Sequence, residues 1–120
     1  MKAPSFISLK DAPKIRQTEA LETTFLTGFN GEKMMMVLSA TLPNHSVALH
    51  SHPHEQIGMV YSGKAVLKIG DEERIAEKGD FYRIPVNVPH SDKCIGNEPF
   101  IVLDIFYPLR EDFLKKVDKP

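Results

Sequence analysis

The sequence predicts an all-β fold, a sandwich or barrel of short strands in a single domain over residues 1–120, with a short helix at its C-terminal end. Three observations lead to this prediction. The length of 120 residues fits one domain, 9 Pro and 7 Gly interrupt the chain at short intervals, and the runs between them are rich in Val, Ile, Phe, Tyr and Met. Short strands at regular spacing with turn residues between them are typical of sandwiches and barrels.

Ten segments have the β-branched and aromatic composition of strands. In chain order they are Phe6–Leu9, Glu22–Phe29, Lys33–Leu42, Ser46–His50, Gln56–Ser62, Ala65–Ile69, Arg74–Ala76, Phe81–Ile84, His90–Ile95 and Phe100–Tyr107. Asn30-Gly31 lies between two of these segments and predicts a hairpin. Gly70-Asp71 predicts a second tight turn.

The segment Arg110–Val117 is the predicted helix. Its acidic residues come first and its lysines last, the order that the helix dipole favours, and this order also allows two i,i+4 ion pairs. Its apolar residues share one face: Phe113, Leu114 and Val117. We expect this face to pack against the strands.

Composition excludes several classes of protein. The chain has 15 Lys and Arg against 16 Asp and Glu, so it lacks the positive charge that general nucleic-acid binding requires. No run approaches the roughly 18 apolar residues of a membrane helix, and the first residues do not resemble a secretory leader. The single Cys cannot form an internal disulfide. We expect a cytoplasmic protein.

Two strands are apolar on both faces. In Gln56–Ser62 and in Ile101–Tyr107, the side chains of alternate residues point to opposite faces, and large apolar residues occur on each. The inside of a small barrel covers only one face. The other needs a second sheet, the N-terminal segment or another subunit, and we therefore expect a homodimer.

The segment His50-Ser51-His52-Pro53-His54-Glu55-Gln56 holds the clearest candidate site. His50 and His52 project from the same face of an extended chain, and a further donor a few residues later can converge with them on a metal ion. Taken alone, two histidines in this spacing also fit a polar loop.

The wider spacing resembles the two motifs of the cupin family. His50-x-His52, three residues, Gln56, six residues and Gly63 match the first motif, which spans about residues 44–63. Gly79, five residues, Pro85, four residues and His90 resemble the second, which spans about residues 79–94. The chain departs from the family pattern at four positions: Asn44 and Asn87 replace glycines, Gln56 replaces an acid, and Cys94 replaces an asparagine.

This resemblance implies a double-stranded β-helix, or jelly-roll barrel, around one divalent transition-metal ion per chain (Ni, Zn, Fe, Mn or Co). By motif position the ligands are His50, His52, Gln56 and His90. Because Gln56 adds no negative charge, we expect an electrophilic ion that polarises a substrate oxygen. His54 is expected near the mouth of the barrel, and Cys94 as a small buried residue whose role near the site stays open.

The far strand carries a second candidate group. An inward Asp104 needs a partner or a function, and two interpretations are open. Asp104 and Arg110 can form a structural ion pair, or Asp104 can be an acid/base group beside a substrate whose carboxylate Arg110 binds. The pattern Asp104-x-Phe106-x-x-x-Arg110-Glu-Asp, together with the histidine segment, is similar to the KdgF-type cupins of pectin degradation.

That narrower resemblance implies that Asp104, Phe106 and Arg110 line a substrate pocket, and that the substrate is a carboxylated sugar, a 4,5-unsaturated uronate converted into a linear keto sugar. Two other functions remain open. One is a metal-dependent dioxygenase of the cupin class, and the other is a cupin that binds a sugar or small acid without catalysis.

Overall fold

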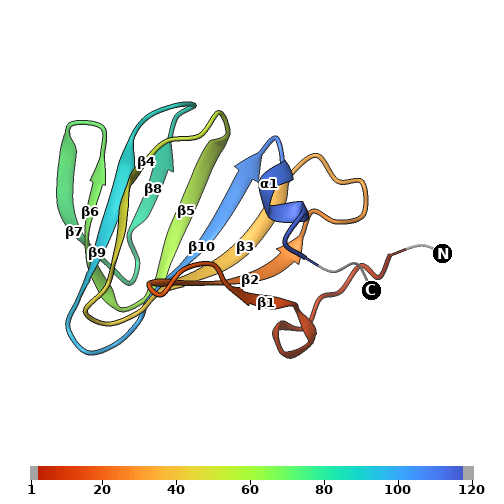
Figure 1. Ribbon diagram of the computed structural model, residues 1–120, viewed down its shortest axis with the longest axis horizontal. Helices are drawn as coiled ribbons and strands as arrows, with labels where there is room; N and C mark the ends of the chain where they lie inside the picture. The colour runs from red at the N-terminus through yellow and green to blue at the C-terminus, as the bar shows by residue number, and fades with distance from the viewer. Residues whose placement is uncertain (1–2, 118–120) are drawn as a thin grey trace.

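The computed structural model describes residues 3–117, which form two antiparallel sheets packed face to face (Figure 1). The six-stranded sheet has the order β1-β2-β3-β10-β5-β8, and the four-stranded sheet has the order β4-β9-β6-β7. The strands are β1 (Lys14–Arg16), β2 (Leu21–Thr27), β3 (Met35–Thr41), β4 (Ser46–His50), β5 (Glu55–Ser62), β6 (Lys64–Ile69), β7 (Glu72–Glu77), β8 (Phe81–Ile84), β9 (His90–Ile95) and β10 (Phe100–Tyr107). The all-β prediction is confirmed.

Most predicted strands occur within a few residues of their expected bounds, but the first one is wrong. Phe6–Leu9 pairs with no strand, and the short 3-10 helix Leu9–Asp11 follows it. Phe6 is 92% exposed, so this apolar run has no surface to pack on within the described chain. The first strand is instead β1, whose three residues are too few to show an alternating pattern.

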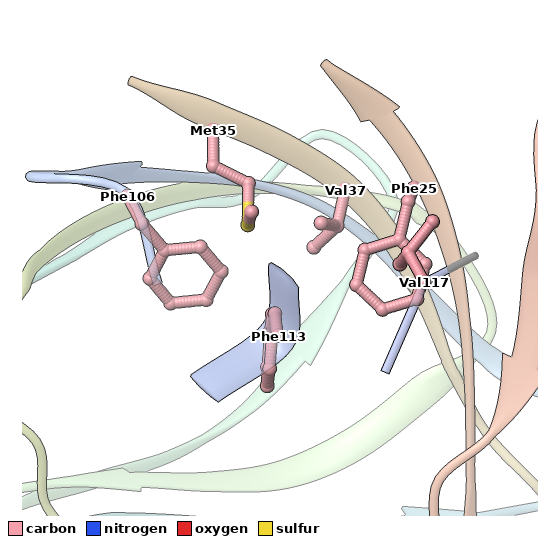
Figure 2. Packing of buried hydrophobic residues seen from close by; sticks show 6 residues of the cluster. All are labelled: Phe25, Met35, Val37, Phe106, Phe113 and Val117. Atoms are coloured by element: carbon pink, nitrogen blue, oxygen red, sulfur yellow. The ribbon is translucent and has the colours of Figure 1, made fainter. Parts of the chain in front are cut away.

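The helix is shorter than predicted. Helix α1 spans Glu111–Leu114, and the chain continues to Val117 in turns whose N–H groups bond three residues back. The expected apolar face is confirmed, because Phe113 and Val117 are buried against β2, β3 and β10 (Figure 2). The expected i,i+4 ion pairs do not form. Asp112 binds Arg110, and Lys116 donates to Gln17.

Two apolar clusters form the core, one that packs α1 on the six-stranded sheet and one that joins the two sheets, and a cavity lies between them. One cluster lies beneath α1 and contains Phe25, Met35, Val37, Phe106, Phe113 and Val117 (Figure 2). The other lies at the opposite end and contains Val60, Ala65, Ala76, Cys94, Phe100 and Val102. Cys94 therefore packs in an apolar cluster, with its thiol donating to the carbonyl of Glu98, and it does not line the cavity.

The outer face of the six-stranded sheet is apolar, as the alternation in β5 and β10 predicts. Val60, Val102 and Phe106 point inward and are buried, whereas Ile57 and Tyr61 point outward and are about half exposed. Among the described N-terminal residues, β1 pairs with the edge of β2, and Ile57 and Tyr61 stay exposed. Among residues 3–117, no helix is long and apolar enough to span a membrane.

The two asparagines that replace motif glycines keep the backbone conformation that glycine favours. Asn44 has φ 66° and Asn87 has φ 64°, both in the left-handed region, which asparagine tolerates better than other residues with a side chain. The backbone N–H of Asn87 donates to the carbonyl of His52 at 2.9 Å. The loop between β8 and β9 is thereby attached to the histidine segment.

We predict that Asn87→Ala lowers the free energy of unfolding by about 1 kcal/mol, because alanine resists the left-handed conformation, whereas Asn87→Gly retains stability. Urea denaturation of the three proteins measures the difference. Asn97→Ala is the matched control, since Asn97 is also an exposed loop residue but does not have a positive φ. Equal stability of the alanine and glycine variants would show that the turn does not depend on this conformation.

Candidate metal centre and its cavity

Three histidines from two strands and a loop converge at one end of the cavity. His50 ends β4, His52 follows it in the loop, and His90 begins β9, directly across from His50 in the four-stranded sheet. One ring nitrogen of each lies within 4.8 Å of the others. His52 and His90 are buried, while His50 is exposed at the mouth. The structure thus brings together the three histidines that the motifs single out.

The backbone fixes the tautomer of all three rings. Nδ1–H of His50 donates to the carbonyl of Ala48 at 2.7 Å, and His90 makes the same bond to Val88 at 2.9 Å. Nδ1–H of His52 donates to the carbonyl of His54 at 3.1 Å. Because a carbonyl only accepts, each Nδ1 must carry the proton and each neutral ring keeps a lone pair on Nε2. Such bonds orient the histidine ligands of metal sites.

Gln56 supplies a fourth donor atom. Its Oε1 lies 3.0 Å from Nε2 of His52, and the residue is 7% exposed. Burial, followed by the positive charge of Arg110, lowers the pKa of His52 to about 4, so the ring is neutral at pH 7. Two lone pairs therefore face each other, and a cation between them would satisfy both. The donor set of three imidazoles and an amide oxygen fits a divalent transition metal.

Two other residues near this cluster are not part of it. Glu55, the neighbour of Gln56, is exposed on β5 and lies outside the group of donor atoms. The ring of His54 lies 5.4 Å from that of His52 between centroids, and its Nδ1 is buried without a partner among the described residues. Through its carbonyl, His54 contributes to the orientation of His52.

Asp104 lies on the inner face of β10 and is 5% exposed. Burial raises the pKa of its carboxyl to about 6, although hydrogen bonds from Tyr82 and from the Gln56 amide act in the opposite direction. Since a carboxylate accepts hydrogen bonds, the amide nitrogen of Gln56 faces Asp104 and its oxygen faces the histidines. Gln56 therefore connects the carboxyl to the three-histidine cluster.

Tyr82 reaches Asp104 across a glycine, a contact that sequence reasoning missed. Asp104 pairs with Gly58, and Gly58 pairs with Tyr82, so the three residues form one row across β10, β5 and β8. The Tyr82 hydroxyl donates to Oδ1 of Asp104. A Cβ on Gly58 would lie 2.2 Å from the Tyr82 ring and 2.6 Å from Asp104 Oδ1. The space beside Gly58 is therefore filled by the phenol of Tyr82.

Arg110 does not pair with Asp104, so the structural ion pair, one of the two interpretations left open by the sequence, is absent from the described residues. Its Nε and Nη2 donate to the two carboxylate oxygens of Asp112 at 3.1 and 2.7 Å. The guanidinium lies over the Phe113 ring at 4.0 Å and 5.1 Å from the centre of the Phe106 ring. These contacts hold a cation at the end of the cavity near His52, where it lowers the pKa of that ring.

The cavity has a volume of about 350 Å³, and His50, Gln56, His90, Asp104, Phe106 and Arg110 line it. This volume suits a small ligand. Asp92 also lines it, and burial raises the pKa of its carboxyl. Sequence reasoning missed Tyr82 and Asp92, yet the alternation in their strands indicates both, because Tyr82 shares a face with Ile84, and Asp92 with His90.

We predict that Asp104→Asn stabilises the metal-free protein at pH 8. The folded state raises this pKa from 3.8 to about 6, so it favours the protonated carboxyl, and stability is lost as pH rises through this range. This difference in pKa corresponds to at most about 3 kcal/mol of unfolding free energy. An asparagine cannot ionise, and its oxygen can still accept from Tyr82.

Urea denaturation in the presence of a chelator, at pH 4 and pH 8, measures this effect. The free energy of unfolding of the variant should exceed that of the wild type mainly at pH 8. Asp71→Asn, at an exposed turn, should show no such pH dependence. A variant less stable than the wild type at pH 8 would indicate that a cation compensates the carboxylate in the folded state, as the ion-pair interpretation requires.

Comparison with known proteins agrees with the fold. A cupin domain model matches residues 37–106, more than half of the chain. An H2HPP isomerase of Bacillus subtilis is 34% identical over 71 residues, which are 58% of this chain and 30% of that protein. The chain thus covers less than a third of the length of this relative.

Two solved structures share the fold over nearly the whole chain. An RmlC-like cupin from Shewanella frigidimarina has 25% identity and a TM-score of 0.81, with 92% of this chain and 96% of that chain covered. KdgF from Halomonas sp. has 22% identity and a TM-score of 0.83, with 93% and 100% covered. With its family model, its paired sheets and its histidine cluster in agreement, this chain belongs to the cupin domain family.

Proposed function

We propose that this protein is a metal-dependent isomerase that moves a proton within a small carboxylated sugar, without oxidation or reduction. The observation that carries the proposal is the Asp104 carboxyl, which is buried beside the three-histidine cluster and has a pKa raised to about 6. A carboxyl with a pKa near the working pH is suited to accept a proton and return it. Perturbed carboxyls in a cavity are typical of catalytic sites.

His50, His52 and His90, with the amide oxygen of Gln56, would hold the metal ion. When bound, a divalent transition metal would supply Lewis-acid polarisation of a substrate oxygen. The chain's own part is to orient the three rings so that Nε2 of each faces the site, which the carbonyls of Ala48, His54 and Val88 do. The amide of Gln56 then fixes the distance between this cluster and Asp104.

The reaction that we propose is the ring opening and ketonisation of a 4,5-unsaturated uronate. The anomeric hydroxyl loses a proton, the bond between C1 and the ring oxygen breaks to leave an aldehyde and an enol, and C4 gains a proton as the enol becomes a ketone. The atoms of substrate and product are the same, so no oxidant is needed. Asp104 is placed to carry the proton, since it is mainly ionised at pH 7 and can be protonated reversibly.

Arg110 and Phe106 have the chemistry to bind such a substrate. The guanidinium is held at the cavity by Asp112 and by the two phenylalanine rings, and its charge and planar geometry suit a carboxylate. The Phe106 ring lies 5.6 Å from the His52 ring between centroids and offers an apolar surface for the face of a sugar ring. The relative named as an isomerase supports an isomerisation as the reaction.

We also propose a homodimer and a cytoplasmic location. The dimer would cover the outer apolar face of the six-stranded sheet, to which β5 contributes Ile57 and Tyr61 and β10 contributes half-buried Leu103 and Ile105. Exposed apolar surfaces of this kind mark sites of association. The location rests on the single cysteine, Cys94, a buried free thiol that suits a reducing compartment.

We predict that Asp104→Asn lowers kcat on an unsaturated galacturonate by about 10²–10⁴-fold with unchanged metal content, because the proton carrier is lost. Arg110→Lys keeps the charge but not the planar geometry, so it should mainly raise KM. The assay follows the loss of the ultraviolet absorbance of the conjugated substrate, and elemental analysis follows the metal.

Two controls accompany this experiment. The double variant His50→Ala/His52→Ala should fold but lose both the metal and the activity, whereas Asp71→Asn should retain both. A metal-loaded Asp104→Asn protein that turns over substrate at the native rate would remove Asp104 from the mechanism. Consumption of oxygen during turnover would favour the dioxygenase alternative.

For the dimer, we predict that sedimentation at micromolar concentration shows two chains per particle. Replacement of Tyr61 and Ile57 by Glu should shift the equilibrium to the monomer, because charges at the centre of the interface would be desolvated. Glu73→Gln, on the exposed face of β7 in the other sheet, is the control. A wild-type monomer under these conditions would rule out the proposed interface.

A further inference from the structure

One wall of the cavity carries polar groups that the proposed reaction does not use. Ser39 and Thr41 point inward from β3, two residues apart, and Asp92 points inward from β9 in the opposite sheet. All three line the same cavity as His90, Asp104 and Arg110. Asp92 is not among the donor atoms that can hold a metal.

Asp92 is held across the gap between the sheets. The Thr41 hydroxyl donates to Oδ1 of Asp92 at 2.8 Å, and Thr41 is 2% exposed. Oδ2 of Asp92 accepts no hydrogen bond from residues 3–117, and it is not among the buried side-chain atoms that lack a partner there. This oxygen is therefore accessible within the cavity, on a carboxylate whose orientation Thr41 fixes.

A carboxylate oxygen held in a fixed orientation inside a cavity is a strong acceptor for a hydroxyl group. The hydroxyls of Ser39 and Thr41 provide further lone pairs for a second substrate hydroxyl. Arg110, by contrast, offers a positive charge to the same cavity. A ligand that satisfies all of these groups has a carboxylate on one side and hydroxyl groups on the other.

We propose that Asp92, with Thr41 and Ser39, forms a subsite that binds the hydroxyl groups of the substrate, so that the cavity selects polyhydroxylated acids over simple acids. The inference rests on the proposed function, because it names the substrate class of that site. It concerns recognition and not proton transfer, and it can therefore be tested by binding alone.

The bond between Thr41 and Asp92 also joins the two sheets, and the test must separate this structural role from recognition. Asp92→Asn is the appropriate variant, because the asparagine oxygen can still accept from Thr41 while the charge is lost. Ser39→Ala is the second variant, since Ser39 makes no side-chain hydrogen bond to the described residues and can be changed without breaking the link between the sheets.

The experiment compares two probes by calorimetric titration of the protein as purified with its metal. D-galacturonate has a ring, a carboxylate and hydroxyls but no double bond, so it cannot undergo the reaction. Tetrahydropyran-2-carboxylate has the ring and the carboxylate without hydroxyls. Asp92→Asn should weaken the binding of galacturonate by about ten- to a hundredfold, the range for a hydrogen bond to a charged group, and leave the second probe unaffected.

Ser39→Ala should weaken the binding of galacturonate by a smaller factor and leave the binding of the second probe unchanged, whereas Arg110→Lys should weaken the binding of both probes. Glu73→Gln should change neither. Variants with a lower melting temperature but unchanged affinity for galacturonate would overturn the proposal and leave only a structural role. Equal affinity of the wild type for both probes would overturn it as well. Selective binding without turnover of unsaturated uronates would retain the subsite and refute the proposed reaction.

Discussion

The Asp104 carboxyl is buried on an inner strand of the six-stranded sheet without a cation beside it, and the surrounding residues are arranged to satisfy it. The phenol of Tyr82 donates to one carboxyl oxygen, and the amide of Gln56 supplies a second hydrogen bond. Tyr82 can reach the carboxyl only because Gly58 leaves the intervening position empty. These bonds partly oppose the effect of burial, so the pKa stays at about 6 instead of rising further.

Gln56 links this carboxyl to the three histidines. Asp104 accepts a hydrogen bond from the amide nitrogen of Gln56, and the amide oxygen therefore faces the histidines. The amide oxygen would then be the fourth donor beside three imidazole rings, which backbone carbonyls orient. Because an amide oxygen brings no negative charge, a bound ion would keep more of its charge to polarise a substrate, which suits proton transfer between oxygen and carbon.

The position of the cavity follows from the packing of the two sheets. The apolar cluster around Val60 and Phe100 holds the two sheets together at one end, the other cluster packs α1 on the six-stranded sheet, and the polar side chains lie between them. The segment after β10 completes one cluster with Phe113 and Val117, and the same segment holds Arg110 over two aromatic rings. Docking of this short helix therefore both closes the core and places the cation that faces the site.

Several features were determined by the sequence alone. Alternation along β5 and β10 predicted which residues face inward, because side chains of a strand alternate between its faces. The spacing of His50, His52 and His90 within two motifs predicted the cluster that the structure brings together. The bounds of β4, β8, β9 and β10 were predicted without error, since turn residues mark both ends of each strand.

Other features depended on the tertiary structure. Phe6–Leu9 has the composition of a strand but finds no partner, and pairing cannot be read from composition. The partner of Arg110 was decided by the turn into α1, which places Asp112 nearer than Asp104. The contact between Tyr82 and Asp104 joins strands that are neighbours in neither sequence nor sheet, and it required the register that sets Gly58 between them. Local sequence fixes the face on which a side chain lies, whereas only the pairing of distant strands decides which side chains meet there.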